Sequence, residues 1–199
     1  MKRKQEELHA QGFTIIELML AIAIAGIVMA SFYSVYISQQ SSYLRQEKVA
    51  SMHQNIRSAM YYMGREIRMA GLDPTGEAGA GIQSDSSASS IHFTEDISGQ
   101  NGNGPPDGDT GDTNEDITYS LTDNDGDGDT DLVRNTGTGN RLIAENIMSL
   151  IFKYWDGTGE TEATPSASRF VDITLKAVTD DGSMDRTITA RINCRNLGY

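Results

Sequence analysis

The stretch Gly12-Phe13-Thr14-Ile15-Ile16-Glu17-Leu18 decides how the rest of this chain is organised. From Leu18 to Ile37 the sequence contains no Asp, Glu, Lys, Arg or His, so Glu17 is a single carboxylate at the start of an apolar segment of membrane length. Placing a charged side chain in the apolar centre of a bilayer costs about 2.5 to 3.5 kcal/mol on insertion scales. Glu17 is therefore predicted to have a functional partner.

The residues on either side of the apolar segment indicate a retained membrane anchor. Lys2-Arg3-Lys4 makes a basic start, which holds that end in the cytoplasm by the positive-inside rule. An ordinary secretory signal has its small-residue cleavage site after the apolar region, but here apolar character continues beyond Ala30-Ser31 to Tyr36. The alternative to a functional acid is a plain single-pass helix whose Glu17 snorkels to the lipid headgroups.

The string Gly-Phe-Thr-x-x-Glu before an apolar run resembles the cleavage signal of type IV prepilins and pseudopilins. In that family a prepilin peptidase cuts after the glycine and methylates the new N-terminus, which implies cleavage after Gly12 and methylation of Phe13. The acid at the position of Glu17 neutralises the N-terminal amine of a neighbouring subunit during assembly. The resemblance therefore implies that the N-terminal helix contacts other pilins.

One long helix is predicted after the cleavage site, because no proline occurs from Phe13 to Ala70. Apolar residues recur every three or four positions in its second half: Val49, Met52, Ile56, Met60, Met63 and Ile67. Gly71 and Pro74 are expected to end the helix, and Tyr61 and Tyr62 are expected to join the core. The predicted organisation is a cleaved leader 1–12, a transmembrane and filament-core helix 13–37, an amphipathic helix 38–71, and a β-rich head 72–199 with acidic loops over 95–139.

Short runs with a period of two predict strands in the head. Their alternating residues are Ile91 and Phe93; Ile117, Tyr119 and Leu121; Leu132; Leu150 and Phe152; Val171, Ile173, Leu175 and Ala177; and Ile188, Ala190 and Ile192. The last two runs face each other across the hairpin signal Asp181-Gly182. The predicted fold class is α+β, a long N-terminal helix packed on an antiparallel sheet, and the resemblance implies the same type IV pilin fold.

Two further stretches indicate which groups within this family the chain resembles. The ending Arg195-Asn196-Leu197-Gly198 resembles the C-terminus of PilW-like minor pilins and of the related J-type minor pseudopilins of type II secretion. Arg65-Glu66-Ile67-Arg68-Met69-Ala70-Gly71, at the expected end of the helix, is more similar to the PilW-like group.

The charge of the head is strongly one-sided. Residues 73–139 contain fifteen Asp or Glu and a single base, Arg134, which leaves fourteen negative charges in that stretch. A surface this acidic repels phosphate backbones, so nucleic acid is excluded as a ligand of the head. Divalent cations are favoured instead.

A calcium site is predicted where the acidic residues are regularly spaced. The pattern D-x-D-x-D-G-x-x-D lets a short loop wrap one hard cation with oxygen ligands, and the candidate ligands are Asp123, Asp125, Asp127, Asp129 and Asp131. Arg134 stands where an EF-hand has its bidentate glutamate, so a looser site or a hydrated hairpin tip is expected. A second cluster lacks regular spacing and is expected to be a flexible loop: Asp107, Asp109, Asp112 and Asp116.

The cysteine and histidine residues do not indicate a catalytic centre. Cys194 is the only cysteine, which excludes an internal disulfide, and it falls on the apolar face of an alternating run, which predicts a buried thiol. His9, His53 and His92 are scattered along the chain and form no motif.

The function predicted from these observations is structural rather than enzymatic. A minor pilin would be processed by prepilin peptidase, wait in the bacterial inner membrane with its head in the periplasm, and enter a type IV pilus to prime or cap assembly. A J-type pseudopilin of a type II secretion system shares the same signal and is the first alternative. A membrane-anchored hydrolase with a carboxylate pair is a remote one, because the sequence lacks a Ser-His-Asp set and a phosphate-binding glycine loop.

Overall fold

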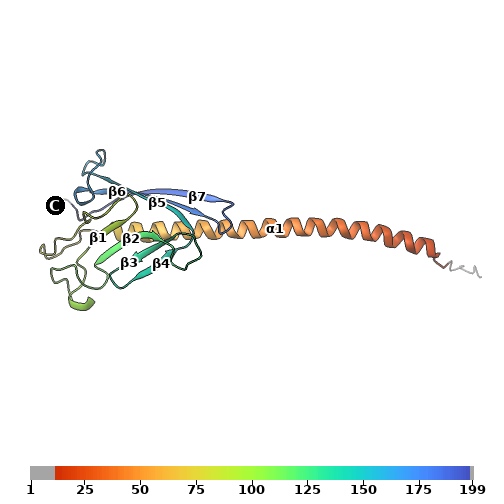
Figure 1. Cartoon of the computed structure of the whole chain (residues 1–199), viewed down its shortest axis with the longest axis horizontal. Helices are drawn as coiled ribbons and strands as arrows, with labels where there is room; N and C mark the ends of the chain where they lie inside the picture. The colour runs from red at the N-terminus through yellow and green to blue at the C-terminus, as the bar shows by residue number, and fades with distance from the viewer. Residues whose placement is uncertain (1–11, 198–199) are drawn as a thin grey trace, which may run out of the picture. The chain divides into compact units, whose positions relative to one another are not determined.

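The computed structural model describes residues 12–197, and Figure 1 shows their helix and strands. The chain divides after Glu47 into two compact units. The described part of the first unit, residues 12–47, consists of the start of the chain and the first part of helix α1. The second unit, residues 48–197, contains the rest of α1 and all of the strands found among the described residues.

Helix α1 runs from Ile15 to Ile67, which confirms the predicted long N-terminal helix. It ends four residues before Gly71, the last residue of the predicted helix 38–71. The cause is competition from the strands, because the Gly71 N–H donates to the carbonyl of Thr94 at 3.0 Å and not to the helix. Gly71 has a φ of +79°, and a Cβ there would lie 2.3 Å from Leu197 Cδ2, so glycine is required at this turn.

One face of α1 in the second unit is buried, as the apolar spacing predicted. Its buried residues are Met52, Ile56, Ala59, Met63, Gly64 and Ile67. Tyr61 and Tyr62 are 74% and 37% exposed, so the prediction that they join the core is wrong. At 100° per residue, Tyr61 lies on the far side of the helix from both Ala59 and Met63, whose burial fixes the inward face.

The strands form two antiparallel sheets, where the sequence indicated one. The first sheet has the order β1-β2-β3-β4, with β1 Ile91–Thr94, β2 Asp116–Thr122, β3 Asp131–Asn135 and β4 Asn140–Ala144. The second has the order β5-β6-β7, with β5 Ile147–Trp155, β6 Phe170–Val178 and β7 Asp185–Asn193. Two short 3₁₀ helices, Gln100–Gly102 and Pro165–Ala167, lie in loops. The predicted hairpin at Asp181-Gly182 joins β6 to β7.

Strand β4 was not predicted, and it is the strand after which the chain changes sheets. Its side chains are mostly exposed, so the strand carries no clear alternation of apolar and polar residues. Asn146, with a φ of +58°, turns the chain between β4 and β5. Its carbonyl accepts a hydrogen bond from the Val178 N–H, and the next N–H, of Ile147, donates to the carbonyl of Thr130. The two sheets are therefore joined by main-chain contacts around Asn146.

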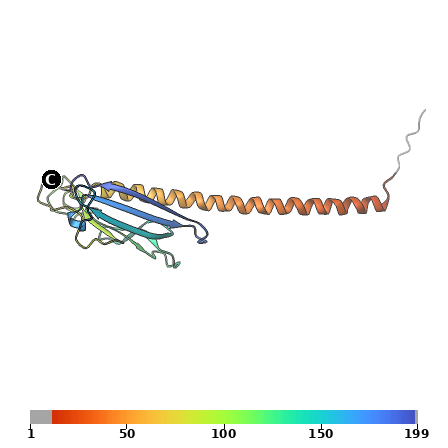
Figure 2. The same ribbon diagram turned by 90° about the horizontal axis from the view of Figure 1, so that it is seen from above.

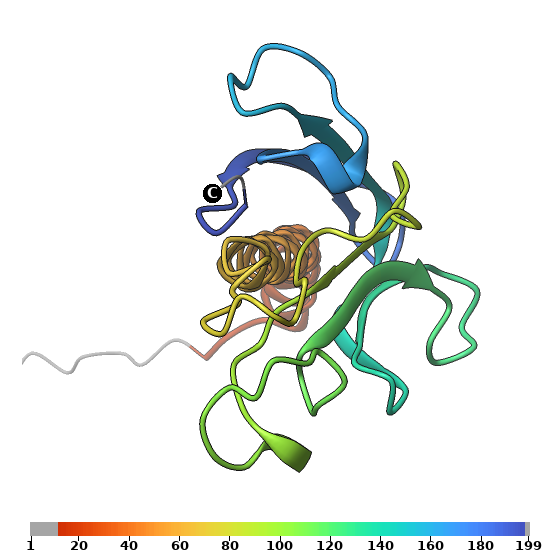
Figure 3. The same cartoon turned by 90° about the vertical axis from the view of Figure 1, so that its left-hand side faces the viewer.

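The core lies between the buried face of α1 and the two sheets. Figure 3 views the second unit along the helix, with sheet β5–β7 on one side of it and sheet β1–β4 on another. Figure 2 shows the β6–β7 hairpin, in blue, beside the C-terminal part of α1. At one end of this contact Lys48 Nζ lies 3.0 Å from Asp181 Oδ2. At the other, Gly64 lets Ile192 approach so closely that a Cβ would lie 3.0 Å from its Cδ1.

Candidate functional site

Glu17 is held in the first turn of α1 by Thr14. The Thr14 backbone N–H and hydroxyl both donate to Glu17 Oε2, at 2.8 and 2.9 Å, and the Glu17 N–H donates to Thr14 Oγ1 at 3.3 Å. This reciprocal arrangement is a capping box, which satisfies N–H groups that have no partner within the helix. The Thr-x-x-Glu spacing is the sequence signal of this capping box. The capping box gives Glu17 a structural role that its position in the membrane-length segment does not reveal.

The predicted cleavage bond lies outside the helix. Gly12 and Phe13 precede α1 and have no regular secondary structure, and the Phe13 side chain is 92% exposed. A Cβ on Gly12 would meet no atom within 4 Å, so the described chain itself places no steric demand for glycine there. Packing within the described residues therefore gives no reason for glycine at position 12.

The first part of α1 presents apolar side chains on all of its faces. Every large apolar residue from Phe13 to Leu44 is exposed, with exposed fractions from 46% at Val28 to 92% at Phe13. Within the described residues, α1 is the one helix long and apolar enough to cross a membrane. A surface of this kind is stable only in lipid or against other apolar helices.

The predicted calcium ligands lie in the loop between β2 and β3, here called the β2–β3 loop (residues 123–130). Oxygen atoms of Asp123, Asp125 and Asp127 lie within 4.8 Å of one another, and all three side chains are exposed. Asp123 accepts hydrogen bonds from the N–H groups of Gly126 and Gly128, at 2.7 and 3.2 Å. The structure thus brings together three of the five predicted ligands.

The other two predicted ligands lie outside that group. Asp129 is exposed, and its N–H donates to Asp127 Oδ1 at 2.9 Å. Asp131 begins β3 and is buried, and its Oδ1 accepts a hydrogen bond from the Asn146 N–H at 3.2 Å. Asp131 therefore contributes to the link between the sheets around Asn146.

Three residues of the second acidic cluster lie close together in one loop. Asp107, Asp109 and Asp112 lie in the connection between β1 and β2, here called the β1–β2 loop (residues 95–115), and their oxygens lie within 4.8 Å of one another. Asp116, the fourth member of the predicted cluster, is instead the first residue of β2 and contacts His92. The only sequence signal for this group was that its three acidic residues lie close together in the chain. Their spacing matches no known metal-binding motif.

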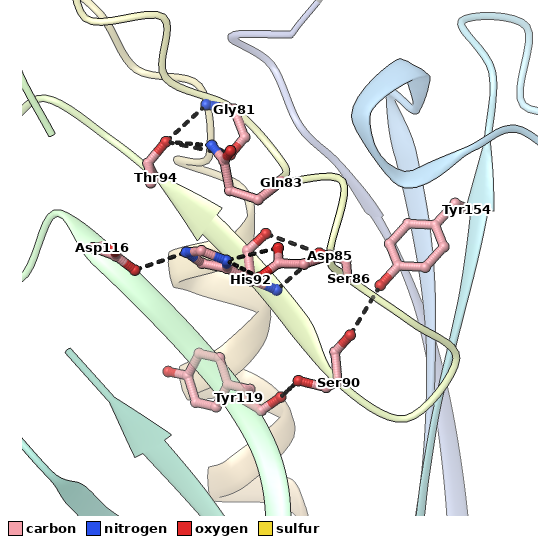
Figure 4. A network of polar contacts seen from close by, with 10 residues as sticks. All are labelled: Gly81, Gln83, Asp85, Ser86, Ser90, His92, Thr94, Asp116, Tyr119 and Tyr154. Atoms are coloured by element: carbon pink, nitrogen blue, oxygen red, sulfur yellow. Dashed lines mark hydrogen bonds and ion pairs between the residues drawn. The ribbon is translucent and has the colours of Figure 1, made fainter. Parts of the chain in front are cut away.

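His92 fastens the segment before β1 to the first sheet, as Figure 4 shows. Its Nδ1 lies 2.8 Å from Asp85 Oδ1, and its Nε2 lies 2.8 Å from Asp116 Oδ1. Ser86 Oγ donates to the His92 carbonyl and accepts from the His92 N–H, both at 2.9 Å. These contacts give His92 a structural role that its isolated place in the sequence did not indicate.

A cavity of about 460 Å³ opens between α1 and the first sheet, within the second unit. Inside it, Glu66 Oε2 accepts hydrogen bonds from Tyr119 Oη at 2.6 Å and from Arg134 Nε at 2.9 Å. Glu95 is 6% exposed, and its Oε2 has no hydrogen-bond partner. Burial raises the pKa of the Glu95 carboxyl to about 7, and the nearby Glu66 carboxylate adds to the shift.

Cys194 is a buried free thiol, as predicted. It lies directly after β7, and its N–H donates to the carbonyl of Arg169 at 2.9 Å. Burial raises the pKa of its thiol to about 12, although the Arg68 guanidinium acts in the opposite direction. The thiolate needed for nucleophilic chemistry is therefore disfavoured at neutral pH.

Comparison with known proteins identifies the N-terminal segment. Residues 8–33 match the prokaryotic N-terminal methylation motif, of which residues 8–11 lie outside the described part of the structure. No curated protein matches the chain. The motif includes Gly12-Phe13, which has no regular secondary structure and precedes an apolar helix capped by Glu17. This methylation motif, followed by one long helix and antiparallel sheets, supports a type IV pilin-like protein that is processed by prepilin peptidase.

Proposed function

We propose that this chain is a minor pilin, which is cut after Gly12, methylated at Phe13 and incorporated into a type IV pilus to prime or cap assembly at the tip. The observation that carries this proposal is the coincidence of the methylation motif over 8–33 with a helix whose large apolar residues are all exposed from Phe13 to Leu44. Such a helix requires one apolar environment before assembly and another after it. Lipid supplies the first, and neighbouring pilin helices supply the second.

Glu17 favours the transfer of the helix from lipid into the filament. Its carboxylate costs free energy in lipid, and its hydrogen bonds to Thr14 offset only part of that cost. A neighbouring subunit offers the positively charged amine of a processed Phe13, and pairing the two charges lowers the cost of keeping both away from water. Assembly is therefore favoured over residence in the membrane.

The minor rather than major class of pilin is supported by features of the head. Cys194 is the only cysteine, so the C-terminal disulfide loop of many major pilins is absent from this sequence. The ending Arg195-Asn196-Leu197-Gly198 resembles the PilW-like minor pilins. A J-type pseudopilin of type II secretion is the alternative that the same features allow. We further propose that the β2–β3 loop binds calcium through Asp123, Asp125 and Asp127.

Mass spectrometry of sheared and purified filaments tests the proposal. We expect a peptide that begins with N-methylated Phe13 in the filament fraction, present at far lower abundance than the major subunit. The matched control is a strain carrying Gly12→Leu, whose filaments should lack the protein. Absence of the mature protein from wild-type pili would contradict the proposal. Loss of protein secretion with intact pili in a deletion strain would assign the chain to a secretion filament instead.

A further inference from the structure

The cavity between α1 and the first sheet has the size of a small-molecule site. Its volume is about 460 Å³, and such sites occupy about 300 to 1,000 Å³. Helix α1 lines it with one face, because Tyr62, Arg65, Glu66 and Met69 are spaced by three or four positions or are adjacent. Exposed apolar side chains of Tyr62, Met69 and Ile97 border the cavity, and the remaining lining residues are polar or charged.

Two of the charged side chains in this cavity pair with each other. Arg134 Nε donates to Glu66 Oε2 at 2.9 Å, and Arg134 Nη1 donates to Asn114 Oδ1 at 3.2 Å. The Arg134 side chain is buried, so this pair belongs to the packing of β3 against α1. The opposite charges of Glu66 and Arg134 therefore offset each other and leave the other charged groups of the cavity to be considered.

Glu95 is a buried acid that lines the same cavity and has no cation of its own. Its Oε2 has no hydrogen-bond partner among the described residues. Burial is the main cause that raises its pKa to about 7; the carboxylates of Glu66 and Glu115 act in the same direction and the Arg134 guanidinium in the opposite one. A buried carboxyl oxygen without a partner lowers stability, so Glu95 is available to a hydrogen-bond donor that enters the cavity.

Arg65 and Arg141 are two further charged residues that line this cavity. Within residues 12–197, the side chain of neither takes part in an ion pair or a hydrogen bond. Arg141 is directly opposite Arg134 in the pairing of β3 with β4, and both line the cavity. Like charges directly opposite each other destabilise a strand pair, so an anion bound at Arg141 relieves their repulsion.

We propose that this cavity binds a free acidic α-amino acid, whose amine pairs with Glu95 and whose two carboxylates pair with Arg65 and Arg141. Apart from the Glu66–Arg134 pair, the charged lining residues carry two positive charges and one negative charge. An acidic amino acid carries the complementary set, two negative charges and one positive charge. Arginine binds carboxylates through two parallel hydrogen bonds, which gives such a site both affinity and orientation.

Isothermal titration calorimetry of the full-length protein in detergent micelles tests the proposal, with L-glutamate and L-aspartate as probes. We expect saturable binding of at least one of them, with a dissociation constant of about 1 mM or lower. Glutarate has the carboxylates of glutamate and no amine, and it should bind about tenfold more weakly because the bond to Glu95 is lost. Glutamine, in which an amide replaces one carboxylate, should also bind about tenfold more weakly than glutamate.

Four variants test the assignment of each contact. Arg65→Gln and Arg141→Gln should each weaken binding of the acidic amino acid about tenfold, because a charged partner is lost. Glu95→Gln keeps the size of the side chain and should abolish the preference for glutamate over glutarate. Arg57→Gln is the matched control, because Arg57 is an exposed arginine of α1 that does not line the cavity, and it should leave affinity unchanged. Near-UV circular dichroism reports whether each variant is folded.

The pH dependence of binding identifies the group that meets Glu95. An amine pairs with the ionised carboxylate, and the pKa of Glu95 is about 7. Wild-type affinity for the acidic amino acid should therefore rise several-fold from about pH 6 to about pH 8, and the affinity of Glu95→Gln should stay constant. An affinity that instead falls over this range would show that protonated Glu95 donates to a carboxylate, which contradicts the amine contact.

Three further results would overturn the proposal. The first is the absence of saturable binding with both acidic amino acids, and the second is equal affinity for glutamate and glutarate. The third is wild-type affinity in both Arg65→Gln and Arg141→Gln. If Glu95→Gln does not fold, the comparison of glutamate with glutarate on the wild-type protein tests the amine contact by itself.

Discussion

Thr14 and Glu17 cap helix α1 through three reciprocal hydrogen bonds, of which the shortest joins the Thr14 N–H to Glu17 Oε2 at 2.8 Å. The contact holds the Glu17 carboxylate against Thr14, which directly follows Phe13, the predicted mature N-terminus. Glu17 is thus a hydrogen-bond acceptor within its own chain, and the proposed function gives its negative charge a second role, as the partner of a neighbouring subunit's N-terminus. Substitutions can separate these roles, since glutamine keeps the acceptor and removes the charge.

Glu17→Ala and Glu17→Gln are both expected to be cleaved and inserted into the membrane normally, because the apolar segment becomes more apolar. Both are expected to be incorporated poorly into filaments, because the charge partner of the neighbouring N-terminus is lost. Quantitative immunoblots of sheared filaments against whole cells give the incorporated fraction. Wild-type incorporation of Glu17→Gln would show that the capping hydrogen bond, and not the charge, is what assembly requires.

Gly12→Leu is expected to leave the precursor uncut, because a peptidase site that accepts glycine leaves little room for a larger side chain. The chain itself has open space around Gly12, so folding of the described residues should not change. N-terminal sequencing of the membrane-bound protein measures the outcome. A sequence that still begins at Phe13 in this variant would refute the cleavage assignment.

Calcium binding by the β2–β3 loop is expected to stabilise the protein by about 1.4 to 2.7 kcal/mol at about 10 mM calcium, if the dissociation constant is about 0.1 to 1 mM. Thermal unfolding of the full-length protein in detergent measures this increment. Asp125→Ala with Asp127→Ala should abolish the increment and leave the calcium-free Tm unchanged or higher, because two like charges are removed. A calcium increment of full size in that variant would exclude the loop as the site. Magnesium should do less than calcium.

Asp172 and Arg191 are expected to make the stability of the head depend on acid pH. Arg191 Nε and Nη2 donate to the two oxygens of Asp172 at 2.6 and 2.8 Å, and these bonds hold the pKa of the Asp172 carboxyl below its usual value. A lowered pKa stabilises the folded state above about pH 4, and the contribution disappears as the pH falls through the lowered value.

The Asp172→Asn variant should therefore lose about 1 kcal/mol at pH 7, a modest value because the Arg191 side chain is 47% exposed. The difference from wild type should shrink and then disappear as the pH falls through the lowered pKa of Asp172. Urea unfolding followed by the fluorescence of Trp155, the only tryptophan, measures both values. Asp185→Asn, which removes an exposed carboxylate 3.4 Å from Lys176 Nζ, is the control and should change stability less. Equal pH profiles for Asp172→Asn and wild type would contradict this account.

Cys194 is expected to resist alkylation in the folded protein. Its thiol is fully buried, and its pKa is raised to about 12, so both access and thiolate are lacking at about pH 8. Mass spectrometry after iodoacetamide treatment should show an unmodified native protein and one added group after unfolding in urea. Rapid modification of the native protein would show that the end of β7 opens readily.

The sequence by itself determined the features that depend on neighbouring residues. The run from Gly12 to Ile37 indicated the cleavage signal and the apolar helix, because cleavage and insertion are read from local order and composition. Spacing of three or four predicted the buried stripe around Ile56 and Met63, and alternation predicted β2, β6 and β7. In these elements each residue's environment follows from the period of its own helix or strand.

Tertiary structure alone decided which distant residues meet. Strand β4 exists because β3 pairs with it, although its own side chains are mostly exposed, and Tyr61 faces outward because Ala59 and Met63 define the packed face. Asp96 accepts a hydrogen bond from the Gly108 N–H, and its own N–H donates to the carbonyl of Leu72 in the segment after α1. Such contacts join residues far apart in sequence, and their free energy is realised only when the whole core forms, so no local pattern records them.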